Sequence, residues 1–539
     1  MNMRKSVIVI VLLALAVLSM SGPSHAQSWL DAEQVLLRYP LLSIGNAAAI
    51  TSFAPRDSSQ MHLSDGRLTI MADRGYLSPL NAAPRAWEVQ GHVQSIYRMS
   101  RRVVVRGMME YSYNWGSRAG GSVWIDAEQM PFDITEVDDS TRGDNSLETY
   151  RLCGETGVDV GGGVSLGARF DYTTASGAKK KDPRHTTTLM GCNVAAGVTW
   201  HIAGLTVGAD YRYRRTTEAL KFSTVGRTDR VYLYLIDHGA VFGREESTQG
   251  NGYTGSANER PLLDTRHGVA LLANWSQGFQ CWGLEAGWMH RDGHYGLESP
   301  SMIDFNRHNG DTWNVNGWWL HDEDHTLQRV SLSWERNAIS DYERTYRIIT
   351  EQGVTDVNYY DDRLMGERLT DEITMRADVQ WGVRRMLPAW RLETELSYNH
   401  RSLTASLFPY YRQQRTHLTA LTIIGSHHWL RANDQVWSMS LTAGWSGGGG
   451  TAAQDGTYQE PAAGAPFPAT VPLLLMRQYE YLTASRMLAG FGLRWSMPVH
   501  RARMRLYADV AYRYIQAFGI HYLENGHRHH VAVSVGCQF

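Results

Sequence analysis

One stretch of the chain matches a catalytic motif of hydrolases. Gly444-Trp445-Ser446-Gly447-Gly448 fits the G-x-S-x-G pattern, which exposes a nucleophilic serine at a sharp turn between a strand and a helix. Here Ser446 ends an alternating segment and leads into the run Gly447 to Gly450 and a loop rich in Gly, Ala and Pro, with no helical pattern. The stretch is therefore predicted to be a flexible outer loop, and the chain is not expected to be an enzyme.

A second group has the residue types of a metal site. His321, Asp322, Glu323, Asp324 and His325 follow one another in the chain. Carboxylates and imidazoles suit divalent cations, but selective binding needs a fixed geometry that spacing alone does not supply. We predict a solvated acidic loop on the outer side of the membrane in which the chain is placed below. The alternative is a weak contact to a metal or iron chelate through His321, Asp322, Asp324 and His325, and no cofactor is expected.

Charged residues fall on one face of several alternating segments, of which 373–381 and 502–514 are clear examples. Successive side chains of a strand point to opposite faces, so each such segment has an apolar and a charged surface. Charge is costly against lipid but tolerated in a wet lumen, where opposite charges can pair and stiffen the wall or leave a polar conduit. The residues assigned to the lumen are Arg106, Glu110, Arg169, Asp171, Asp210, Arg212, Arg214, Arg376, Asp378, Arg391, Glu393, Glu395, Arg503, Arg505, Asp509 and Arg513.

The alternation continues to the last residue. Val531, Val533, Val535, Cys537 and Phe539 share one face of the final segment. Elsewhere aromatic residues gather at the ends of the apolar faces, as girdles at two membrane interfaces require. A soluble sandwich also alternates, but it has no reason to end on an aromatic within a strand. We therefore predict an all-β fold, an antiparallel transmembrane barrel, with Val535, Cys537 and Phe539 as a signal for the barrel-insertion machinery.

The spacing of connections predicts the number of strands, because periplasmic turns are short and outer loops long. Short turns fall near 100–102, 161–163, 201–204, 277–280, 337–340, 384–388, 431–434 and 498–501, and long connections at 118–146, 175–184, 218–263, 293–324, 353–366, 403–414, 447–477 and 515–527. With 58–73 as the first strand, the barrel has 18 strands and both ends in the periplasm. Sixteen is the fallback, because 325–336 and 341–352 are the weakest pair.

The start of the chain predicts export. Arg4 and Lys5 precede an apolar run from Val7 to Leu18, and Ser24-His25-Ala26 forms a small-x-small cleavage site. The apolar run has 12 residues, whereas a helix needs about 20 to span a bilayer. Residues 1–26 are therefore predicted to be a signal peptide, and residues 58–539 the barrel.

Residues 27–57 do not alternate. Apolar residues near Leu36 suggest a short helix, and a run of small residues follows from Gly45 to Ala49. The segment is either a partial plug of the lumen or a periplasmic tail. A solvated tail gains nothing from apolar residues, whereas a packed segment buries them. We predict partial insertion, with the run Gly45 to Ala49 against the wall near the periplasmic mouth.

Composition excludes several other classes. Lys and Arg number 52 against 54 Asp and Glu, which leaves no basic excess for nucleic acid. Four cysteines lack CxxC spacing, which argues against a zinc or haem motif, and we expect mostly free thiols. The 51 Gly, 27 Tyr and 18 Trp fit strands that alternate between lipid and a wet lumen.

Three stretches carry a family resemblance. They are residues 42–49, the turn Lys181-Asp182-Pro183-Arg184, and Tyr232-Leu233-Tyr234 together with Asn251-Gly252-Tyr253. They resemble a family of Bacteroidota outer-membrane barrels that has no assigned function and is often encoded beside TonB-dependent receptors. The resemblance implies the outer membrane of a Gram-negative cell. It transfers no catalytic residue, because the family has none.

Two hypotheses for function follow. A barrel of about 16 to 18 strands leaves an aqueous lumen, so the first is a channel, or an accessory component, for uptake of a hydrophilic solute. The alternative is a non-conducting surface scaffold that partners a TonB-dependent receptor or a surface lipoprotein, for example in iron or haem acquisition. Mixed lumenal charge does not name the solute.

Overall fold

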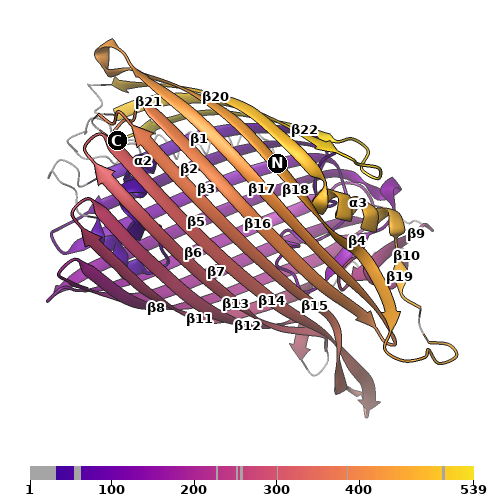
Figure 1. Ribbon diagram of the computed structural model, residues 1–539. Coiled ribbons are helices and arrows are strands. Elements are labelled where there is room, and N and C mark those ends of the chain that lie inside the picture. Colours follow the sequence, from indigo (N-terminus) through magenta and orange to yellow (C-terminus); the bar gives the residue numbers. More distant parts are fainter. Residues whose placement is uncertain are drawn as a thin grey trace.

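A closed wall of strands dominates the computed structural model, which describes residues 32–53, 62–225, 229–249, 253–254, 259–299, 302–384, 386–465, 467–499 and 504–539. Eighteen strands form one antiparallel sheet that closes on itself (Figure 1). Closure pairs the backbone groups of every strand with both neighbours, which a membrane-spanning sheet requires. The predicted signal peptide and Arg503 lie outside the described residues.

The barrel strands follow chain order around the wall. They are β1 (His62–Gly75), β2 (Arg85–Arg98), β3 (Val103–Ala119), β5 (Gly143–Gly161), β6 (Val164–Lys179), β7 (Arg184–Ile202), β8 (Leu205–Ser223), β11 (Arg260–Gln277), β12 (Gln280–Ser299), β13 (Met302–Glu323), β14 (Thr326–Glu351), β15 (Val354–Trp381), β16 (Trp390–Leu407), β17 (Tyr410–Leu430), β18 (Val436–Thr457), β20 (Ser485–Val499), β21 (Met504–Phe518) and β22 (His527–Gln538). β22 pairs with β1, and Phe539 exchanges backbone hydrogen bonds of 2.8 and 3.0 Å with Ser64. The ring therefore closes at the last residue.

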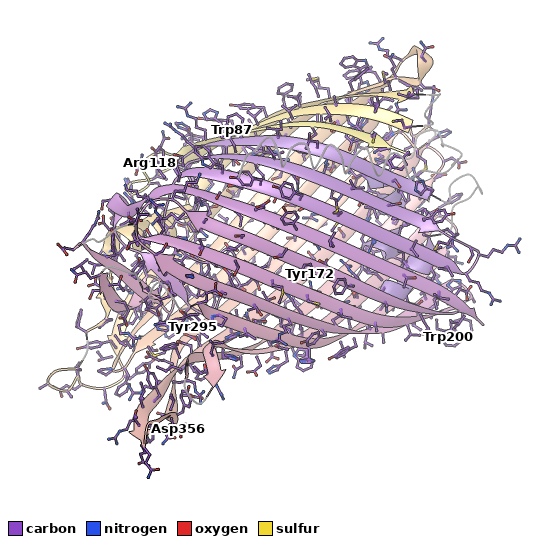
Figure 2. All side chains as sticks on the ribbon, turned by 180° about the vertical axis from the view of Figure 1, so that it is seen from behind. Trp87, Arg118, Tyr172, Trp200, Tyr295 and Asp356 are labelled. Atoms are coloured by element: carbon purple, nitrogen blue, oxygen red, sulfur yellow. The ribbon has the colours of Figure 1, made fainter. Side chains whose placement is uncertain are left out.

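Large apolar side chains cover the outside of this wall. Val535 leaves 52% of its surface uncovered, and Trp87 and Trp200 stand on the outer face at opposite ends of their strands (Figure 2). A soluble protein rarely leaves so extensive an apolar surface in water, whereas lipid covers it in a membrane. The chain is therefore an outer-membrane β-barrel of a Gram-negative cell. Within the described residues, no helix is long and apolar enough to cross a membrane.

The predicted count of 18 strands is confirmed, but some of the predicted boundaries are wrong. The turn expected at 337–340 lies inside β14, so the pair 325–336 and 341–352 is one strand. The long loop expected at 293–324 contains the end of β12 and all of β13. The strand missed there offsets the extra strand predicted within β14, so the predicted total is still 18. β14 and β15 extend far beyond the wall (Figure 1). There lipid no longer demands one apolar face, and the alternation that marks a strand is lost.

Three other predicted loops are also strand. Residues 354–366 belong to β15, and the connection expected at 403–414 is a tight turn between Leu407 and Tyr410. The glycine run after Ser446 lies within β18, which continues to Thr457. Glycine has no side chain to alternate, so the sequence gives no strand signal there. Ser446 thus lies inside a strand, and no elbow forms.

Two sets of segments occupy the two ends of the barrel. Residues 32–53, here named the plug, comprise α2 (Ala32–Arg38) and the 3-10 helices η1 (Pro40–Ser43) and η2 (Ala47–Ser52) at the end where the short turns lie (Figure 1). At the other end, the described residues of 120–142, 224–259 and 458–484, here named the cap, contribute six more elements. These are β4 (Asp133–Glu136), η4 (Asp139–Thr141), β9 (Val231–Asp237), β10 (Phe242–Gln249), β19 (Ala469–Thr470) and α3 (Pro472–Thr483). In addition, η5 (Ala432–Asp434) lies in the short turn between β17 and β18.

The cap has its own sheet. β19, β10, β9 and β4 form four antiparallel strands in that order, which join three loops far apart in the sequence. The loop around 218–263 is thus long, as predicted, but folded. One face of this cap sheet carries the apolar residues Ile134, Tyr234 and Ile236, which pack against the barrel wall. The cap therefore lies on the wall instead of projecting into solvent.

Candidate functional site

The plug touches the wall through small residues on both sides. Ala47 and Ala48 are fully buried. A side chain at Gly167 of β6 would collide with the backbone of Ala48, and one at Gly157 of β5 would lie 2.5 Å from Cγ2 of Ile50. Wall glycines therefore form the shallow surface on which η2 rests. The run Gly45 to Ala49 lies against the wall at the end of the barrel with the short turns.

An apolar cluster anchors the plug as well. Val35, Leu42, Ile50 and Phe53 pack together against wall residues of the first three strands, Leu63, Ile96 and Val104. All seven are buried. The lumenal face was predicted to be charged, but in this sector the wall that meets the plug is apolar. A buried apolar side chain contributes about 1.5–3 kcal/mol relative to an exposed one, so the cluster is a substantial part of the plug's attachment.

Lumenal charges hold the backbone of the plug. Arg106 donates a hydrogen bond of 2.7 Å to the carbonyl of Leu42 and forms an ion pair with Glu155. Arg329 donates to the carbonyls of Leu36 and Leu37 at 3.0 and 3.2 Å. These carbonyls belong to short helical turns whose ends lack internal partners. The arginines of the wall therefore satisfy groups that the plug leaves open.

Three carboxylates complete this attachment. Arg391 of β16 lies 2.6 Å from Glu33, and Arg38 pairs with Asp322. Glu285 accepts the backbone N–H of Gly45 at 3.2 Å. The contacts come from strands on opposite sides of the ring, so the plug spans the mouth instead of lining one side. All of these contacts are hydrogen bonds and ion pairs.

The acidic cluster around Asp322 lies at the end of the barrel with the short turns, next to the plug, so the prediction of an outer loop is wrong. It surrounds the short turn between β13 and β14, and the prediction failed because β13 was missed. Besides the pair of Asp322 with the plug, His321 lies 3.6 Å from Glu323, and Nδ1 of His325 lies 3.4 Å from the carbonyl of Val383. Among the residues that the structure describes, no three His, Cys, Asp or Glu are grouped to hold a metal ion. All four cysteines are free.

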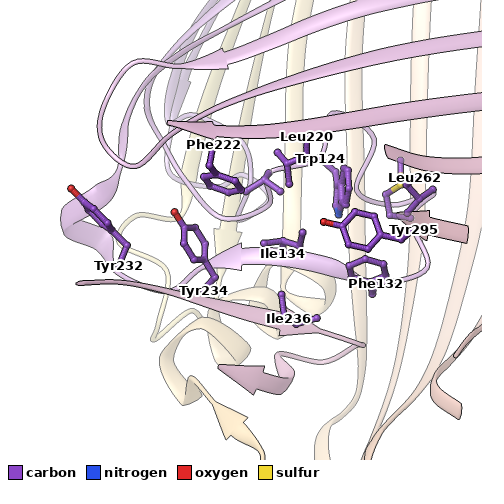
Figure 3. Packing of buried hydrophobic residues seen from close by; sticks show 12 residues of the cluster. Trp124, Phe132, Ile134, Leu220, Phe222, Tyr232, Tyr234, Ile236, Leu262 and Tyr295 are labelled. Atoms are coloured by element: carbon purple, nitrogen blue, oxygen red, sulfur yellow. The ribbon is translucent and has the colours of Figure 1, made fainter. Parts of the chain in front are cut away.

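Aromatic residues pack the cap onto the inner wall (Figure 3). Phe132 of the cap meets Tyr295 of β12 with ring centroids 5.2 Å apart, and Tyr234 of β9 meets Phe222 of β8 at 5.0 Å. Trp124 lies edge-on to Tyr295 at 5.9 Å. Edge-to-face pairs of this kind contribute beyond their buried area. The cap is thus a packed layer, not a set of independent loops.

Buried carboxylates lie inside the cap. Asp133 of β4 and Asp237 of β9 are paired across the two strands. Burial raises the pKa of Asp133 to about 6, and the neighbouring Asp237 adds to that shift. The pKa of Asp237 is also raised by burial, although it accepts backbone hydrogen bonds from Gly239 and Phe242 at 2.8 and 3.1 Å. Two carboxylates facing each other cannot both ionise without cost.

Cavities lie beside the plug and under the cap. The larger has a volume of about 630 Å³, with Glu33 and Leu37 of the plug on one side and charged wall residues on the other. A second of about 330 Å³ lies beneath residues 125–130 of the cap. Volumes of about 300–1,000 Å³ are typical of sites for small molecules. The predicted lumenal residues on the larger cavity are Arg376, Asp378, Arg391, Glu393, Glu395 and Arg513.

Most of the predicted lumenal charges, including several on the larger cavity, form ion pairs within the wall. Their distances are 2.7 Å for Arg376 with Glu395, 2.6 Å for Arg391 with Asp378, 3.5 Å for Arg169 with Asp171, 2.5 Å for Arg212 with Asp210, and 3.5 Å for Arg494 with Asp509. Arg505 donates to Ser496 and to the carbonyl of Asp434, each at 3.0 Å. Glu110 lies on the same face of β3 as Arg106 by alternation. Sequence reasoning missed Glu285 and Arg329, which contact the plug, and Arg38 of the plug itself, because their partners lie far away in the chain.

The comparisons with known proteins place this architecture in a family. A family model described as a family of unknown function (DUF6850) matches residues 54–539. The chain belongs to this family. The plug precedes the matched residues, so the DUF6850 match covers the barrel and its cap. No curated protein matches the chain.

Solved structures show distant similarity to this DUF6850 chain. The ferric preacinetobactin receptor BauA from Acinetobacter baumannii has 10% identity and a TM-score of 0.40, covering 88% of this chain and 80% of BauA. The outer membrane transporter YddB from Escherichia coli has 7% identity and a TM-score of 0.39, covering 88% and 81% of the two chains. The import receptor Fiu from E. coli has 9% and 0.37, covering 88% and 81%. These values carry no conclusion about what this chain binds.

Proposed function

We propose that this DUF6850 protein is a gated channel for uptake of a hydrophilic solute across the outer membrane. The observation that carries the proposal is the charged cavity of about 630 Å³ bounded by the plug. Its walls combine four arginines with four carboxylates, so they can hold water and a polar solute. A scaffold would have no need of such a space.

The attachment of the plug suits a reversible gate. Ion pairs and backbone hydrogen bonds tie it to strands around the ring. Its apolar side chains pack on two sectors of the wall, one at Leu63, Ile96 and Val104 and the other at Leu272 and Trp318. A solute in transit can replace the polar contacts. The apolar cluster must be exposed when the plug moves, which keeps the closed state favoured until energy or a ligand is supplied.

Solute entry into proteoliposomes tests the proposal. Gly167→Leu places a side chain where the backbone of Ala48 lies, and it should force η2 from the wall. Gly154→Leu on the neighbouring strand is the matched control, because a side chain there meets no atom within 4 Å. We expect slow entry of an uncharged disaccharide with the natural chain and the control, and faster entry with Gly167→Leu. Equal, negligible entry for all three, with heat-modifiable barrels in each case, would reject the channel.

One observation favours the scaffold as a second candidate. The hairpin formed by the ends of β14 and β15 projects beyond the barrel, with Asp356 near its tip (Figure 2). Ile348 and Tyr360 are exposed on it, and Arg344 lies 3.6 Å from the ring centre of Tyr359. Such an arm could dock a TonB-dependent receptor or a surface lipoprotein, including one that captures iron or haem. Loss of co-purification with such a receptor after deletion of 346–359 would support this candidate, and its retention would reject it.

A further inference from the structure

Three arginines stand side by side on the inner wall. Arg214 of β8 is the direct partner of Arg266 of β11, and Arg266 is the direct partner of Arg291 of β12. Side chains directly opposite one another in a sheet begin about 4.5–5.5 Å apart, and like charges in that position destabilise the pairing. This Arg214–Arg266–Arg291 row therefore costs stability. A counter-charge or a functional use must offset the cost.

One carboxylate is shared within the row. Asp264 accepts from Nε of Arg266 at 2.8 Å and also forms an ion pair with Arg291. His308 approaches the same carboxylate at 3.3 Å. Arg214 has no hydrogen bond or ion pair with any residue that the structure describes. The nearby carboxylates of Asp264, Asp126 and Asp171 act on Arg214 only through space, so its guanidinium donors remain available.

Arg291 provides a second, independent observation that points to a bound ligand. Its side chain is 1% exposed, and its Nε and Nη1 atoms are buried without a hydrogen-bond partner in the described structure. Buried donors of a charged group are normally satisfied, and leaving them open is costly. The row therefore has unused donors at its buried end as well as at Arg214.

All three arginines line the cavity of about 330 Å³ beneath the cap. The cavity also contains two acids. Asp126 belongs to the roof, and Glu218 belongs to β8 of the wall and accepts the backbone N–H of Ile125 in the roof at 2.5 Å. These acids lie toward the roof, whereas the arginines form a continuous row across three strands. The cavity is polar at both ends but has its positive charge concentrated at the row.

The cap touches the row only through neutral acceptors in the described structure. Gln129 receives a hydrogen bond from Arg266 at its side-chain oxygen, at 3.1 Å, and one from Arg291 at its carbonyl, at 3.0 Å. Arg368 donates to the carbonyl of Met130 at 2.8 Å. A guanidinium can bind a carboxylate or phosphate through two parallel hydrogen bonds and with opposite charge, which a neutral amide or carbonyl oxygen does not offer. An oxyanion in the cavity would therefore compete with Gln129 for the same donors.

We propose that the Arg214–Arg266–Arg291 row binds a phosphate or carboxylate group of the transported solute, and that this binding loosens the cap by displacing Gln129. The proposal rests on the proposed channel function, since it names the class of solute that the lumen admits. Planar guanidinium groups bind both anions with paired hydrogen bonds, so the two are separate arms of one test.

Calorimetric titration of the purified full chain tests the site. Inorganic phosphate and citrate are titrated separately in detergent micelles at constant ionic strength. We expect saturable binding of at least one anion, about 10- to 100-fold weaker affinity in Arg214→Gln, and a smaller loss in Arg214→Lys. The control is Arg494→Gln, which removes the same charge from the inner face of β20, on the far side of the ring.

Two results would overturn the proposal. No saturable heat for either anion, or an equal loss in Arg214→Gln and Arg494→Gln, would show diffuse lumenal charge instead of a site. If Arg214→Gln is not heat-modifiable, Arg214→Lys replaces it in the comparison. The second readout is proteolysis of the cap segment 120–142, which should accelerate with the bound anion in the natural chain and not in Arg214→Gln.

This test separates the site from the channel. Anion binding without any solute entry in Gly167→Leu would leave the row as a binding site and reject the channel. Solute entry without anion binding would leave the channel and reject the row.

Discussion

Replacing Ile50 with alanine should release the plug from the wall. Ile50 is 1% exposed and packs in the apolar cluster with Leu42 and Phe53. Truncating a buried isoleucine to alanine costs about 2–5 kcal/mol, because the transfer energy is lost and a cavity is left. Since the unplugged state does not bury this side chain, the whole cost falls on the closed state. The fraction of molecules with the plug displaced should rise by about 30- to 4,000-fold, at a factor of ten per 1.4 kcal/mol.

Cysteine labelling measures that fraction. Ala47 is fully buried, so a bulky maleimide can modify Ala47→Cys only when the plug has moved. The four native cysteines are free and are first replaced by serine. Labelling of Ala47→Cys should be slow in this parent and faster by the stated factor with Ile50→Ala. Ile423→Ala is the control, because Ile423 is 40% exposed on the lipid-facing side and should leave the rate unchanged.

Two outcomes would refute this reasoning. An unchanged labelling rate in Ile50→Ala would mean that the apolar cluster does not hold the plug. Rapid labelling in the parent, equal to the rate in unfolded protein, would mean that residues 32–53 hang free as a periplasmic tail. A heat-modifiability assay on the same samples separates plug release from loss of the barrel itself.

Two further predictions concern the wall and the cap. Val533→Arg puts a charge against lipid and should cost about 2–4 kcal/mol, which lowers the amount of heat-modifiable protein in the outer membrane. Ala532→Arg on the inner face, where the residue is only partly buried, should be tolerated. Equal levels of the two variants would contradict the assembly role of β22. The pKa of Asp133 is raised to about 6 in the folded cap, so the folded cap favours the protonated acid. The protonated side chain therefore stabilises the cap fully below about pH 4, and this stabilisation is lost as the pH rises through 6. Hydrogen exchange in 120–142, corrected for intrinsic rates, should therefore accelerate between pH 4 and 7. Asp133→Asn should reduce that dependence without abolishing it, because burial also raises the pKa of the neighbouring Asp237. An unchanged slope in Asp133→Asn would assign the dependence to other groups.

Where lipid constrains the chain, the sequence predicted the wall. β21 and β22 alternate strictly, and the short turn at 161–163 separates β5 from β6 as expected. Beyond the membrane the constraint disappears, which is why the ends of β14 and β15 were missed. β13 was missed for another reason: its inner face carries the buried apolar residues Trp318 and Leu320, so apolar and polar residues do not alternate there. Alternation also carries no information on register between distant strands. The Arg214–Arg266–Arg291 row could not be seen for this reason, since the cap segment 224–259 separates β8 from β11.

The plug shows the same division. Its small residues indicated a close approach to other backbone, but the wall glycines that receive it, Gly157 and Gly167, look like ordinary strand glycines in the sequence. The arginines that hold its carbonyls are likewise ordinary members of polar faces. Only the closed ring brings them to one mouth, because Arg106 is 64 residues from Leu42 and Arg329 is 293 residues from Leu36 in the chain.

Single-channel recording across a planar bilayer decides whether the closed lumen is a gate. The purified natural chain should show rare, brief openings, and Gly167→Leu should show long or permanent openings of larger total conductance. Gly154→Leu, whose new side chain meets only open space on the outer face, should behave as the natural chain does. A silent bilayer with all three proteins would contradict the gated channel, and a permanently open natural chain would contradict closure by the plug and the cap.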